Sequence, residues 1–269
     1  MQIGIVAGAG RLPVIISADA KERGYRIVTV ALEGLASIEM DRLSDIIKWV
    51  NPGQLGLMLK IFKDNRVDSV LMAGKVHKSL LLKSKITPDL RAVKVLLSLK
   101  SKSDDVILKA ITREIEKEGM KVIDIASFSP HLLAPEGLLT KTVPSEDEEK
   151  DIQYGWKIAK EIGRLDIGQT VVIKSRAVMA VEAIEGTDEA ILRGGEWAGE
   201  GAVVVKVSKP QQDMRLDVPV VGSDTLQAMI KVRATVLALE AYKSIIVNRK
   251  EFLEVANRAK ISVMGLAKA

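Results

Sequence analysis

The segment from Lys206 to Asp217 combines side chains that bind metals with side chains that bind anions. Within twelve positions its charged and amide residues are Lys206, Lys209, Gln211, Gln212, Asp213, Arg215 and Asp217. Carboxylates are the ligands that Mg²⁺ prefers, and lysine, arginine and amide groups bind phosphate oxygens. The segment therefore predicts a site for a divalent metal and an anionic group.

Asp213 and Asp217 are the candidate catalytic residues and metal ligands of this segment. Pro219 favours an extended backbone before it, and an extended strand would put both carboxylates and Arg215 on one face. The candidates for binding phosphate are Lys209, Gln212 and Arg215. The alternative is a ladder of surface salt bridges without a metal.

Composition restricts the kind of metal that the chain can bind. The 269 residues contain no cysteine and two histidines, His77 and His131. Disulfides, thiolate chemistry and zinc–cysteine sites are therefore excluded, and so is a histidine-rich metal site. We expect any metal to be a hard ion on oxygen ligands, such as Mg²⁺.

The turn Gly8-Ala9-Gly10 follows the apolar run 2–7 and precedes a predicted helix. Glycines let a backbone approach a phosphate, and a helix N-terminus adds amide donors. Gly8, Gly10 and Leu12 are therefore candidates for binding part of a nucleotide. The alternatives are a tight turn without a ligand and an NAD-dependent oxidoreductase, in which Glu33 would bind the ribose. Pro13 in place of a third glycine counts against NAD.

Three further candidates follow predicted strands. Lys75 comes directly after the run 69–73, at the end of a strand where ligands bind in open α/β sheets. His77 lies beside it, and two solvent-exposed cations are the alternative. Glu182 interrupts an apolar strand, where an unpaired carboxylate would be costly. We predict that Lys75, Glu182 and Thr187 contact the substrate.

Positive charge is concentrated in one stretch. Residues 75–102 hold seven lysines and one arginine against one aspartate, a net charge of +7, so the rest of the chain carries −2 of the total of +5. Apolar residues alternate with these cations, which is typical of a face that meets anionic lipid or another anionic ligand. The alternative is a solvated lysine face. Nucleic acid is not expected, because the stretch has no aromatic residue to stack on a base.

The first half of the chain alternates predicted strands with predicted helices. The strands are 2–7, 25–32, 69–73 and 121–125, and the helices are 13–23, 53–65 and 103–118. This alternation with short turns predicts an α/β, Rossmann-like N-terminal domain with a parallel sheet, over residues 1–130. No signal peptide and no apolar run of about 18 residues is present, so we expect a cytoplasmic protein.

Three prolines and a glycine between residues 129 and 144 predict a linker, which we place at 131–147. Ser145 and Glu148 form a capping-box pattern that opens a helix to about residue 162. The remaining predicted elements are strands 170–174, 177–184 and 202–207, helix 225–239, strand 244–247 and helix 250–259. Runs of strands followed by a helix predict an α+β C-terminal catalytic domain over residues 148–269.

Five motifs occur in order along the chain. They are GIVAGAGRLP at 4–13, LLAPEGLLT at 132–140, DIGQTVV at 166–172, VEAIEGTD at 181–188 and KPQQDMRLDVPVVG at 209–222. Together they resemble the LpxI-type UDP-2,3-diacylglucosamine pyrophosphatases. The resemblance covers nearly the whole chain.

The resemblance implies hydrolysis of UDP-2,3-diacylglucosamine to UMP and 2,3-diacylglucosamine 1-phosphate (lipid X) in lipid A synthesis, with attack on the phosphorus of the sugar side. It implies a divalent ion, usually Mg²⁺, two domains with the lipid held between them, and a homodimer. The family's catalytic aspartate falls on Asp217, where Val218 replaces the usual leucine of an Asp-Leu-Pro element. Residues 132–139 and the stretch 75–102 would meet acyl chains and the anionic surface of the inner membrane.

The chain departs from the family pattern in places. The Arg-Pro pair of the Gly-x-Val-x-Arg-Pro element is Lys78-Ser79 here, Glu-Ala-Gly near the C-terminus is Glu240-Ala241-Tyr242, and Arg176 or Ala177 takes the place of a frequent glycine. These changes put the exact substrate preference in question. A non-catalytic nucleotide-sugar or lipid-binding protein is the second alternative function, beside the NAD-dependent oxidoreductase.

Overall fold

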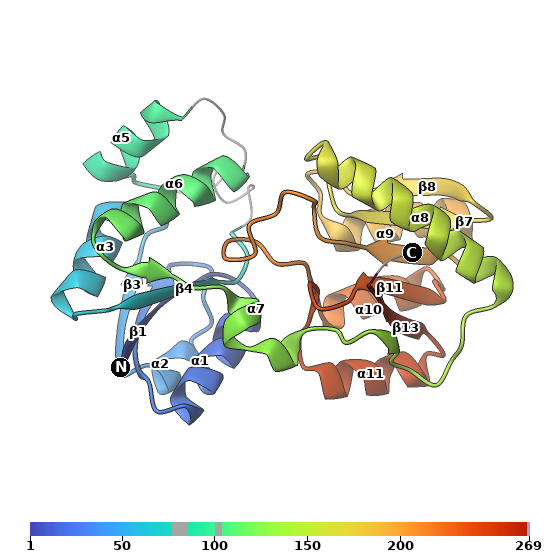
Figure 1. Ribbon diagram of the computed structural model, residues 1–269, viewed down its shortest axis with the longest axis horizontal. Coiled ribbons are helices and arrows are strands. Elements are labelled where there is room, and N and C mark those ends of the chain that lie inside the picture. The colour runs from blue at the N-terminus through green and yellow to red at the C-terminus, as the bar shows by residue number, and fades with distance from the viewer. Residues whose placement is uncertain (77–85, 100–103, 268–269) are drawn as a thin grey trace. The chain divides into compact units, whose positions relative to one another are not determined.

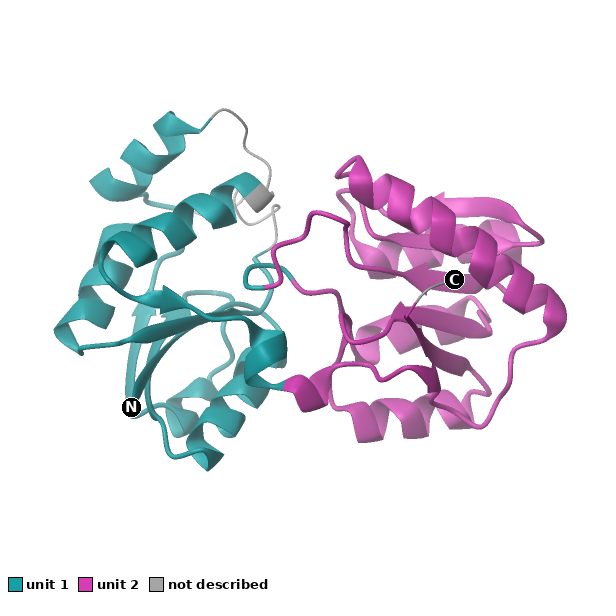
Figure 2. Cartoon of the chain, viewed as in Figure 1, with its two compact units in different colours: residues 1–129, 215–217 teal, residues 130–214, 218–269 magenta. Residues whose placement is uncertain are grey.

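The chain forms two compact units, each with its own β-sheet (Figure 1). The structure is a computed structural model that describes residues 1–76, 86–99 and 104–267. Unit 1 contains Met1–Ser129 and Arg215–Asp217, and unit 2 contains Pro130–Met214 and Val218–Ala269 (Figure 2). Three residues of the polar segment thus group with the first unit, although the residues on either side of them group with the second.

Unit 1 contains a five-stranded parallel sheet with the strand order β3-β2-β1-β4-β5. The strands are β1 (Gln2–Ala7), β2 (Arg26–Leu32), β3 (Ile46–Val50), β4 (Ser69–Ala73) and β5 (Lys121–Val122). The parallel sheet predicted for the first half of the chain is therefore confirmed. Because β1 and β4 are parallel neighbours, the turns that follow them lie at the same edge.

Helices cover the sheet of unit 1. They are α1 (Leu12–Glu22), α2 (Met40–Leu43), α3 (Leu55–Asp64), α5 (Leu90–Ser98), α6 (Asp104–Lys117) and α7 (Ile125–Phe128). One apolar core joins β2 and β4 to α3, α5 and α6, with Phe62 fully buried at its centre. Gly24 has a φ of +74° just past the end of α1, which is the helix stop that the sequence predicts.

Unit 2 contains a six-stranded mixed sheet with the strand order β6-β13-β11-β9-β7-β8. Its strands are β6 (Gly137–Leu138), β7 (Thr170–Lys174), β8 (Ala177–Val181), β9 (Val203–Lys206), β11 (Val236–Glu240) and β13 (Ser262–Leu266). The strands β9, β11 and β13 are parallel, whereas β6, β7 and β8 pair in antiparallel fashion. A separate parallel pair joins β10 (Val220–Val221) to β12 (Ile245–Ile246).

Two apolar cores lie on opposite faces of the sheet in unit 2. Alternate residues of β9, Val203 and Val205, pack with Trp156 on α8 (Glu146–Arg164). Val204, on the other face, packs with the helices α9 (Thr187–Ala198), α10 (Ser223–Lys231) and α11 (Arg249–Arg258). This burial on both faces explains why β9 is an uninterrupted valine run. The chain thus combines helices with a parallel sheet in unit 1, and with a mixed sheet and a separate parallel pair in unit 2.

The capping box at the start of α8 is confirmed. Ser145 and Glu148 exchange both hydrogen bonds of that motif. Farther along α8, the buried carboxylate of Asp151 accepts the N–H groups of Ser175 (2.8 Å) and Arg176 (2.5 Å). Those two residues have φ values of +51° and +56° in the two-residue turn between β7 and β8, so Asp151 stabilises a left-handed turn.

The predicted helix over residues 225–239 is wrong in its second half. Helix α10 ends at Lys231, Arg233 takes a left-handed φ of +55°, and residues 236–240 form the buried central strand β11. A short apolar run that is buried on both faces fits a helix or a strand equally well by its pattern. The pairing of β11 with β9 and β13 decides for the strand.

Four strands, β3, β6, β10 and β13, were absent from the elements expected from sequence. Strand β3 lies at the edge of its sheet and includes two exposed residues, Lys48 and Trp49, so it lacks clean alternation. Strand β13 begins at Ser262, soon after helix α11 ends at Arg258, so only a short stretch of chain separates the two elements. The first residue of the predicted helix 103–118, Ser103, lies outside the described residues. Among the helices that the structure describes, none has the length and apolar character needed to cross a bilayer.

Candidate functional site

The carboxyl ends of β9 and β11 form one edge of the sheet in unit 2. Strand β9 ends at Lys206 and its parallel neighbour β11 ends at Glu240. Strand β7 runs the other way and begins at Thr170, directly opposite Lys206. Glu182 follows β8 at the same edge, because Val181 pairs with Val171. The topology therefore gathers two acids and a lysine where the polar segment 206–217 begins.

Glu182 and Lys206 form a buried network at this edge. Lys206 Nζ donates to Thr187 Oγ1 at 2.6 Å and lies 3.4 Å from Thr170 Oγ1. The Thr187 hydroxyl donates to Glu182 Oε1 at 2.9 Å, and the ammonium lies 4.0 Å from Glu182 Oε2. Glu182 is 8% exposed and Lys206 2%. The structure thus brings together the predicted residues Glu182 and Thr187, each with a protein partner, and substrate contact by either stays a prediction.

The pKa of Glu182 is lowered despite its burial. Burial alone would raise the pKa of this carboxyl, but the charge of Lys206 and hydrogen bonds from Thr170, Thr187 and the Gln169 N–H outweigh that effect. Glu182 is therefore ionised at neutral pH, and Lys206 provides the positive charge that a buried carboxylate needs.

Glu240 forms a second buried network beside the first. Its Oε2 accepts hydrogen bonds from Lys160 Nζ (2.5 Å) and from the N–H and hydroxyl of Ser208 (2.8 Å each). Its Oε1 pairs with Lys243 Nζ at 2.9 Å. Burial raises the pKa of Glu240, but the hydrogen bonds from Lys160, Lys243 and Ser208 lower it more, so the net shift is downward.

The next residues of the polar segment are held by the end of α8. Lys209 Nζ pairs with Asp166 Oδ1 at 2.5 Å, and the Lys209 N–H donates to Gln212 Oε1 at 2.8 Å. The side-chain amide of Gln211 lies 3.2 Å from the carbonyl oxygen of Arg164 at the end of the helix. Lys209 and Gln212 thus each have a protein partner, and phosphate binding by either stays a prediction.

The end of the segment corrects one expectation. Residues 214–216 form a turn, so the predicted extended strand with Asp213, Arg215 and Asp217 on one face is wrong. Arg215 pairs with Glu116 of α6 at 3.0 Å, and Leu216 packs on the apolar core of unit 1. These contacts turn the backbone. Asp217 belongs to unit 1 and Asp213 to unit 2.

Backbone hydrogen bonds join the glycine turn of unit 1 to the turn that follows β4. The Gly8 N–H donates to Ala73 O at 2.8 Å, and Ala9 and Lys75 exchange two backbone hydrogen bonds of 2.9 Å. A Cβ on Gly8 would lie 2.8 Å from Lys75 O, so Gly8 is required for this close approach. The structure therefore brings exposed Lys75 next to Gly8 and Gly10, and it gives the Gly8 and Ala9 amides backbone acceptors.

The other predicted residues of this edge differ in exposure. Gly10 has a φ of +96° and is exposed, whereas Leu12 is buried at the start of α1. Between them, at the N-cap of α1, lies Arg11, whose half-exposed side chain pairs with Glu39. His77 and the Lys78-Ser79 pair lie outside the described residues.

The donor set can be tested against Mg²⁺. Within residues 1–76, 86–99 and 104–267, no group of three or more His, Cys, Asp or Glu side chains is arranged to hold a metal. Mg²⁺ in phosphate-processing enzymes typically binds one or two carboxylates and takes its other ligands from phosphates and water. Asp213 and Asp217 have the chemistry for that role.

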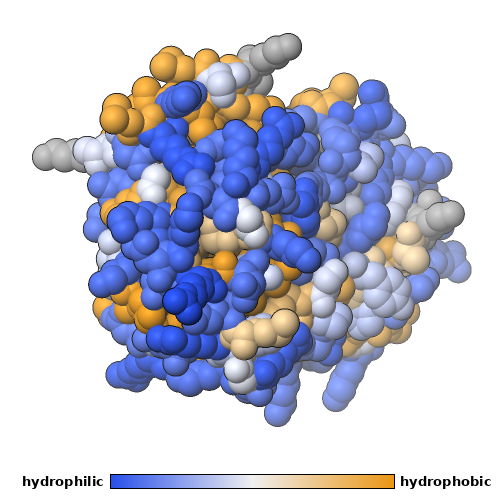
Figure 3. Space-filling view, turned by 60° about the vertical axis from the view of Figure 1, so that its left-hand side comes forward, coloured by the Kyte–Doolittle hydropathy of each residue, from blue (hydrophilic) through white to orange (hydrophobic). Residues whose placement is uncertain are grey.

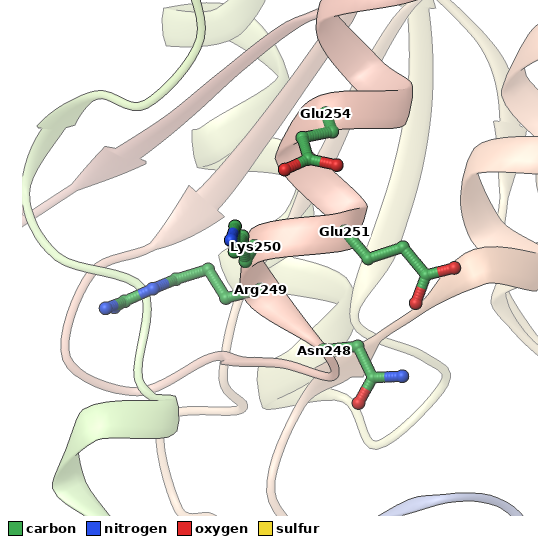
Figure 4. A pocket seen from close by; sticks show the side chains of 5 residues that line it. All are labelled: Asn248, Arg249, Lys250, Glu251 and Glu254. Atoms are coloured by element: carbon green, nitrogen blue, oxygen red, sulfur yellow. The ribbon is translucent and has the colours of Figure 1, made fainter.

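A pocket at the start of α11 does not contribute to this site. It is lined by Asn248, Arg249, Lys250, Glu251 and Glu254. Figure 4 shows these side chains pointing in different directions from the helix instead of toward one point. Arg249 donates to the carbonyl of Leu133 at 3.2 Å. The pocket thus lacks convergent groups and contains none of the predicted site residues.

Sequence reasoning missed Glu240 and two of its partners, Ser208 and Lys160, as members of the edge. Ser208 lies within the polar segment but was not chosen, and Lys160 lies on the face of α8 that appears solvated in the sequence. The available signal was Glu240, a charge that ends the apolar run Val236–Glu240. A carboxylate at the end of a buried strand needs partners, and these two residues supply them.

Known proteins resemble the chain over nearly its whole length. The family model for the LpxI N-terminal domain matches residues 2–132, and that for the LpxI C-terminal domain matches residues 135–264. The UDP-2,3-diacylglucosamine pyrophosphatase LpxI of Caulobacter vibrioides is 31% identical over 276 residues, covering 98% of this chain and 97% of the relative. A solved phosphoribosylglycinamide synthetase from Anaerococcus prevotii is 15% identical, with a TM-score of 0.28. The match covers 71% of this chain and 40% of the synthetase chain.

Proposed function

Since the chain belongs to the LpxI family, we propose that it hydrolyses the pyrophosphate bond of UDP-2,3-diacylglucosamine, releasing UMP and lipid X in lipid A synthesis. The observation that carries this proposal is the relative of that name, matched over 98% of the chain. The oxygen of a water molecule adds to one phosphorus, the bridging P–O bond breaks, and the released protons pass to solvent or a base. We propose that the phosphorus on the sugar side is attacked.

Asp217 is the proposed catalytic carboxylate and ligand of a divalent ion, with Asp213 as its candidate partner. When bound, Mg²⁺ would supply positive charge that stabilises the phosphate oxygens. Lys209, Gln212 and Arg215 are proposed to bind the phosphates, with Lys75 as a further cation. The crowding of cations and carboxylates in 206–217 supports these roles.

Gly8, Gly10 and Leu12 are proposed to shape the place of the nucleotide. Gly8 would act by its lack of a side chain, since its N–H already donates to Ala73 O. Gly10 and the N-terminus of α1, where the helix dipole favours anions, would face the ligand. Glu182 and Thr187 would act on the substrate at the edge of unit 2.

We also propose the finer organisation that the resemblance implies. The strand order β3-β2-β1-β4-β5 supports a Rossmann-like assignment for unit 1. Residues 131–147 are proposed as the linker between an N-terminal and a C-terminal catalytic domain, and the chain as a homodimer on the cytoplasmic side of the inner membrane.

One assay tests the reaction. Purified protein with Mg²⁺ is expected to release UMP from UDP-2,3-diacylglucosamine, and a chelator should stop the release. In ¹⁸O-labelled water, label should enter lipid X if the phosphorus on the sugar side is attacked. UDP should bind and NAD should not. Binding of substrate without UMP release would favour a non-catalytic binding protein, and NAD binding without UDP binding would favour the oxidoreductase.

Helix α5 is the proposed point of contact with an anionic bilayer. Its apolar residues Leu90 and Leu97 are 90% and 82% exposed, and Val93 and Leu96 flank them at 37% and 40%. The side that packs inward does so through Ala92 and Val95, and Arg91 pairs with Glu114 and Glu118, so the two leucines lie outside the apolar core of unit 1. Figure 3 shows apolar residues gathered at the upper edge of the molecule, at the level of α5 in Figure 1. The +7 charge of residues 75–102 disfavours a second copy and favours anionic lipid.

Replacing Leu90 and Leu97 together by glutamate should weaken binding to phosphatidylglycerol vesicles by more than about tenfold, because two apolar side chains no longer enter the bilayer and two negative charges oppose it. Vesicle co-sedimentation measures this. Ile38→Glu is the matched control, since Ile38 is 70% exposed in the same unit but lies outside α5. Equal binding by the double variant and the wild type would contradict the role of α5.

A further inference from the structure

The N–H, hydroxyl and carbonyl groups of Ser208 all form hydrogen bonds within the protein. Its N–H and its hydroxyl both donate to Glu240 Oε2 at 2.8 Å. Its carbonyl oxygen accepts from Lys160 Nζ at 3.0 Å, and the same ammonium donates to Glu240 at 2.5 Å. Ser208 is 2% exposed and Glu240 is 4% exposed. Ser208, near the start of the polar segment 206–217, is therefore fixed in position and orientation by one carboxylate and one lysine.

A buried ion pair costs free energy, and the fold does not require one merely to end strand β11. Burying an ion pair costs free energy that an apolar pair of similar size avoids, so a buried pair is weak evidence for stability. The rest of β11 is apolar and fully buried, and a valine or leucine at its last position would extend the same core. What the carboxylate adds is three directed acceptor contacts on two residues from outside its own strand, Lys160 and Ser208.

The fixed residue lies immediately before the proposed phosphate-binding residues. Lys209 follows Ser208, and its N–H and ammonium are held by Gln212 and Asp166. Asp217 lies nine positions after Ser208. The position of this segment therefore depends at its start on Glu240.

We propose that Glu240 is a positioning residue, which acts through Ser208 and Lys160 to hold the segment 208–217 in the geometry that hydrolysis requires. This inference rests on the proposed function for its kinetic consequence, but its structural part does not. Glu240 itself touches no substrate in this scheme. Its effect is on the orientation of groups that do, which alters the rate of the reacting complex more than ground-state binding.

The test combines kinetics with hydrogen exchange. Glu240→Gln keeps the shape of the side chain but removes its charge and one acceptor oxygen. It should lower kcat by roughly 10–100-fold with KM changed by less than about threefold, because small misplacements of catalytic groups cost rate. Exchange of the amides in 208–217, followed by mass spectrometry, should accelerate in the variant while exchange in the other strands of unit 2 is unchanged.

Variants of Lys243 and Ser208 separate positioning from simple loss of charge. Lys243→Met removes a cation from the same carboxylate, but Lys243 reaches Oε1 and is half exposed, so kcat and exchange should stay at wild-type values. Ser208→Ala should reproduce much of the Glu240→Gln effect, and Ser208→Thr, which keeps the hydroxyl, should restore it. In the Glu240→Gln/Ser208→Ala double variant the losses in kcat should not add.

The outcomes are distinct. Faster exchange in 208–217 with a lower kcat supports the proposal, and additive effects of the two substitutions overturn it. Unchanged exchange in both Glu240→Gln and Ser208→Ala also overturns it, whatever the kinetics show. If the wild type releases no UMP, the proposed function fails, whereas the exchange experiment still decides whether Glu240 holds the segment. Should Glu240→Gln not fold, Ser208→Ala gives the same two readouts.

Discussion

Asp217→Ala is expected to reduce UMP release from UDP-2,3-diacylglucosamine by roughly 10³-fold, through kcat rather than KM. The substitution removes the carboxylate that we assign to the metal and to the activation of water. Groups that bind only the nucleotide or the acyl chains are unaffected, so substrate should still bind. Steady-state kinetics at saturating Mg²⁺, with a substrate-binding measurement on the variant, provides the comparison.

Asp224→Ala is the control for this result. Asp224 is an exposed aspartate in the first turn of α10, seven residues farther along the chain, and its loss should leave the rate within about twofold. Asp213→Asn distinguishes a metal ligand from a brace for its neighbours. If Asp213 is a metal ligand, its replacement should raise the Mg²⁺ concentration needed for half-maximal rate. If Asp213 only holds neighbouring residues in place, that concentration should not change. Full activity of Asp217→Ala would remove Asp217 from the catalytic role.

The first unit was predictable because its signals are local. Strands such as β1 and β4 are continuous apolar runs, and glycines such as Gly24 end the helices that separate them. Where the type of secondary structure depended on partners distant in sequence, the local sequence pattern predicted it wrongly. The run Val236–Glu240 became a strand only because β9 and β13 flank it. A single short apolar run carries no information about such neighbours.

The candidate site likewise has features that the sequence predicted and features that depend on tertiary contacts. The side chains that could bind metal and phosphate were visible from their types within twelve positions. Their backbone geometry was not, because Leu216 is drawn into an apolar core and Arg215 pairs with Glu116, 99 residues away in sequence. Glu240 was overlooked as a member of the site since its partners lie 32 and 80 residues from it. Side-chain chemistry was thus readable from sequence, whereas the contacts that orient it were tertiary.

The second large effect is expected on stability, at the Glu182–Lys206 pair. Lys206→Met should lower the free energy of unfolding by about 3–5 kcal/mol at pH 7, because it leaves a buried carboxylate without its compensating charge. Lys206→Met/Glu182→Gln should recover most of that loss, since neither charge is then buried. Lys60→Met is the control. Lys60 and Asp64 form an ion pair with side chains 67% and 58% exposed, so its loss should cost less than about 1 kcal/mol.

The pH dependence of this loss identifies its cause. In the wild type the pKa of Glu182 is below its ordinary value of 4.5, so its contribution to stability is present above that value and is lost as the pH falls through the folded pKa. In Lys206→Met, burial is no longer opposed by the lysine, and the pKa of Glu182 should rise above its value in the unfolded chain. The folded variant then takes up a proton as the pH falls, which stabilises it while the wild type loses stability. Urea denaturation should therefore show the largest gap between the two proteins at pH 7 and a much smaller gap near pH 4. A gap that is independent of pH would mean that Lys206 contributes by packing, and that its charge is not what keeps Glu182 ionised.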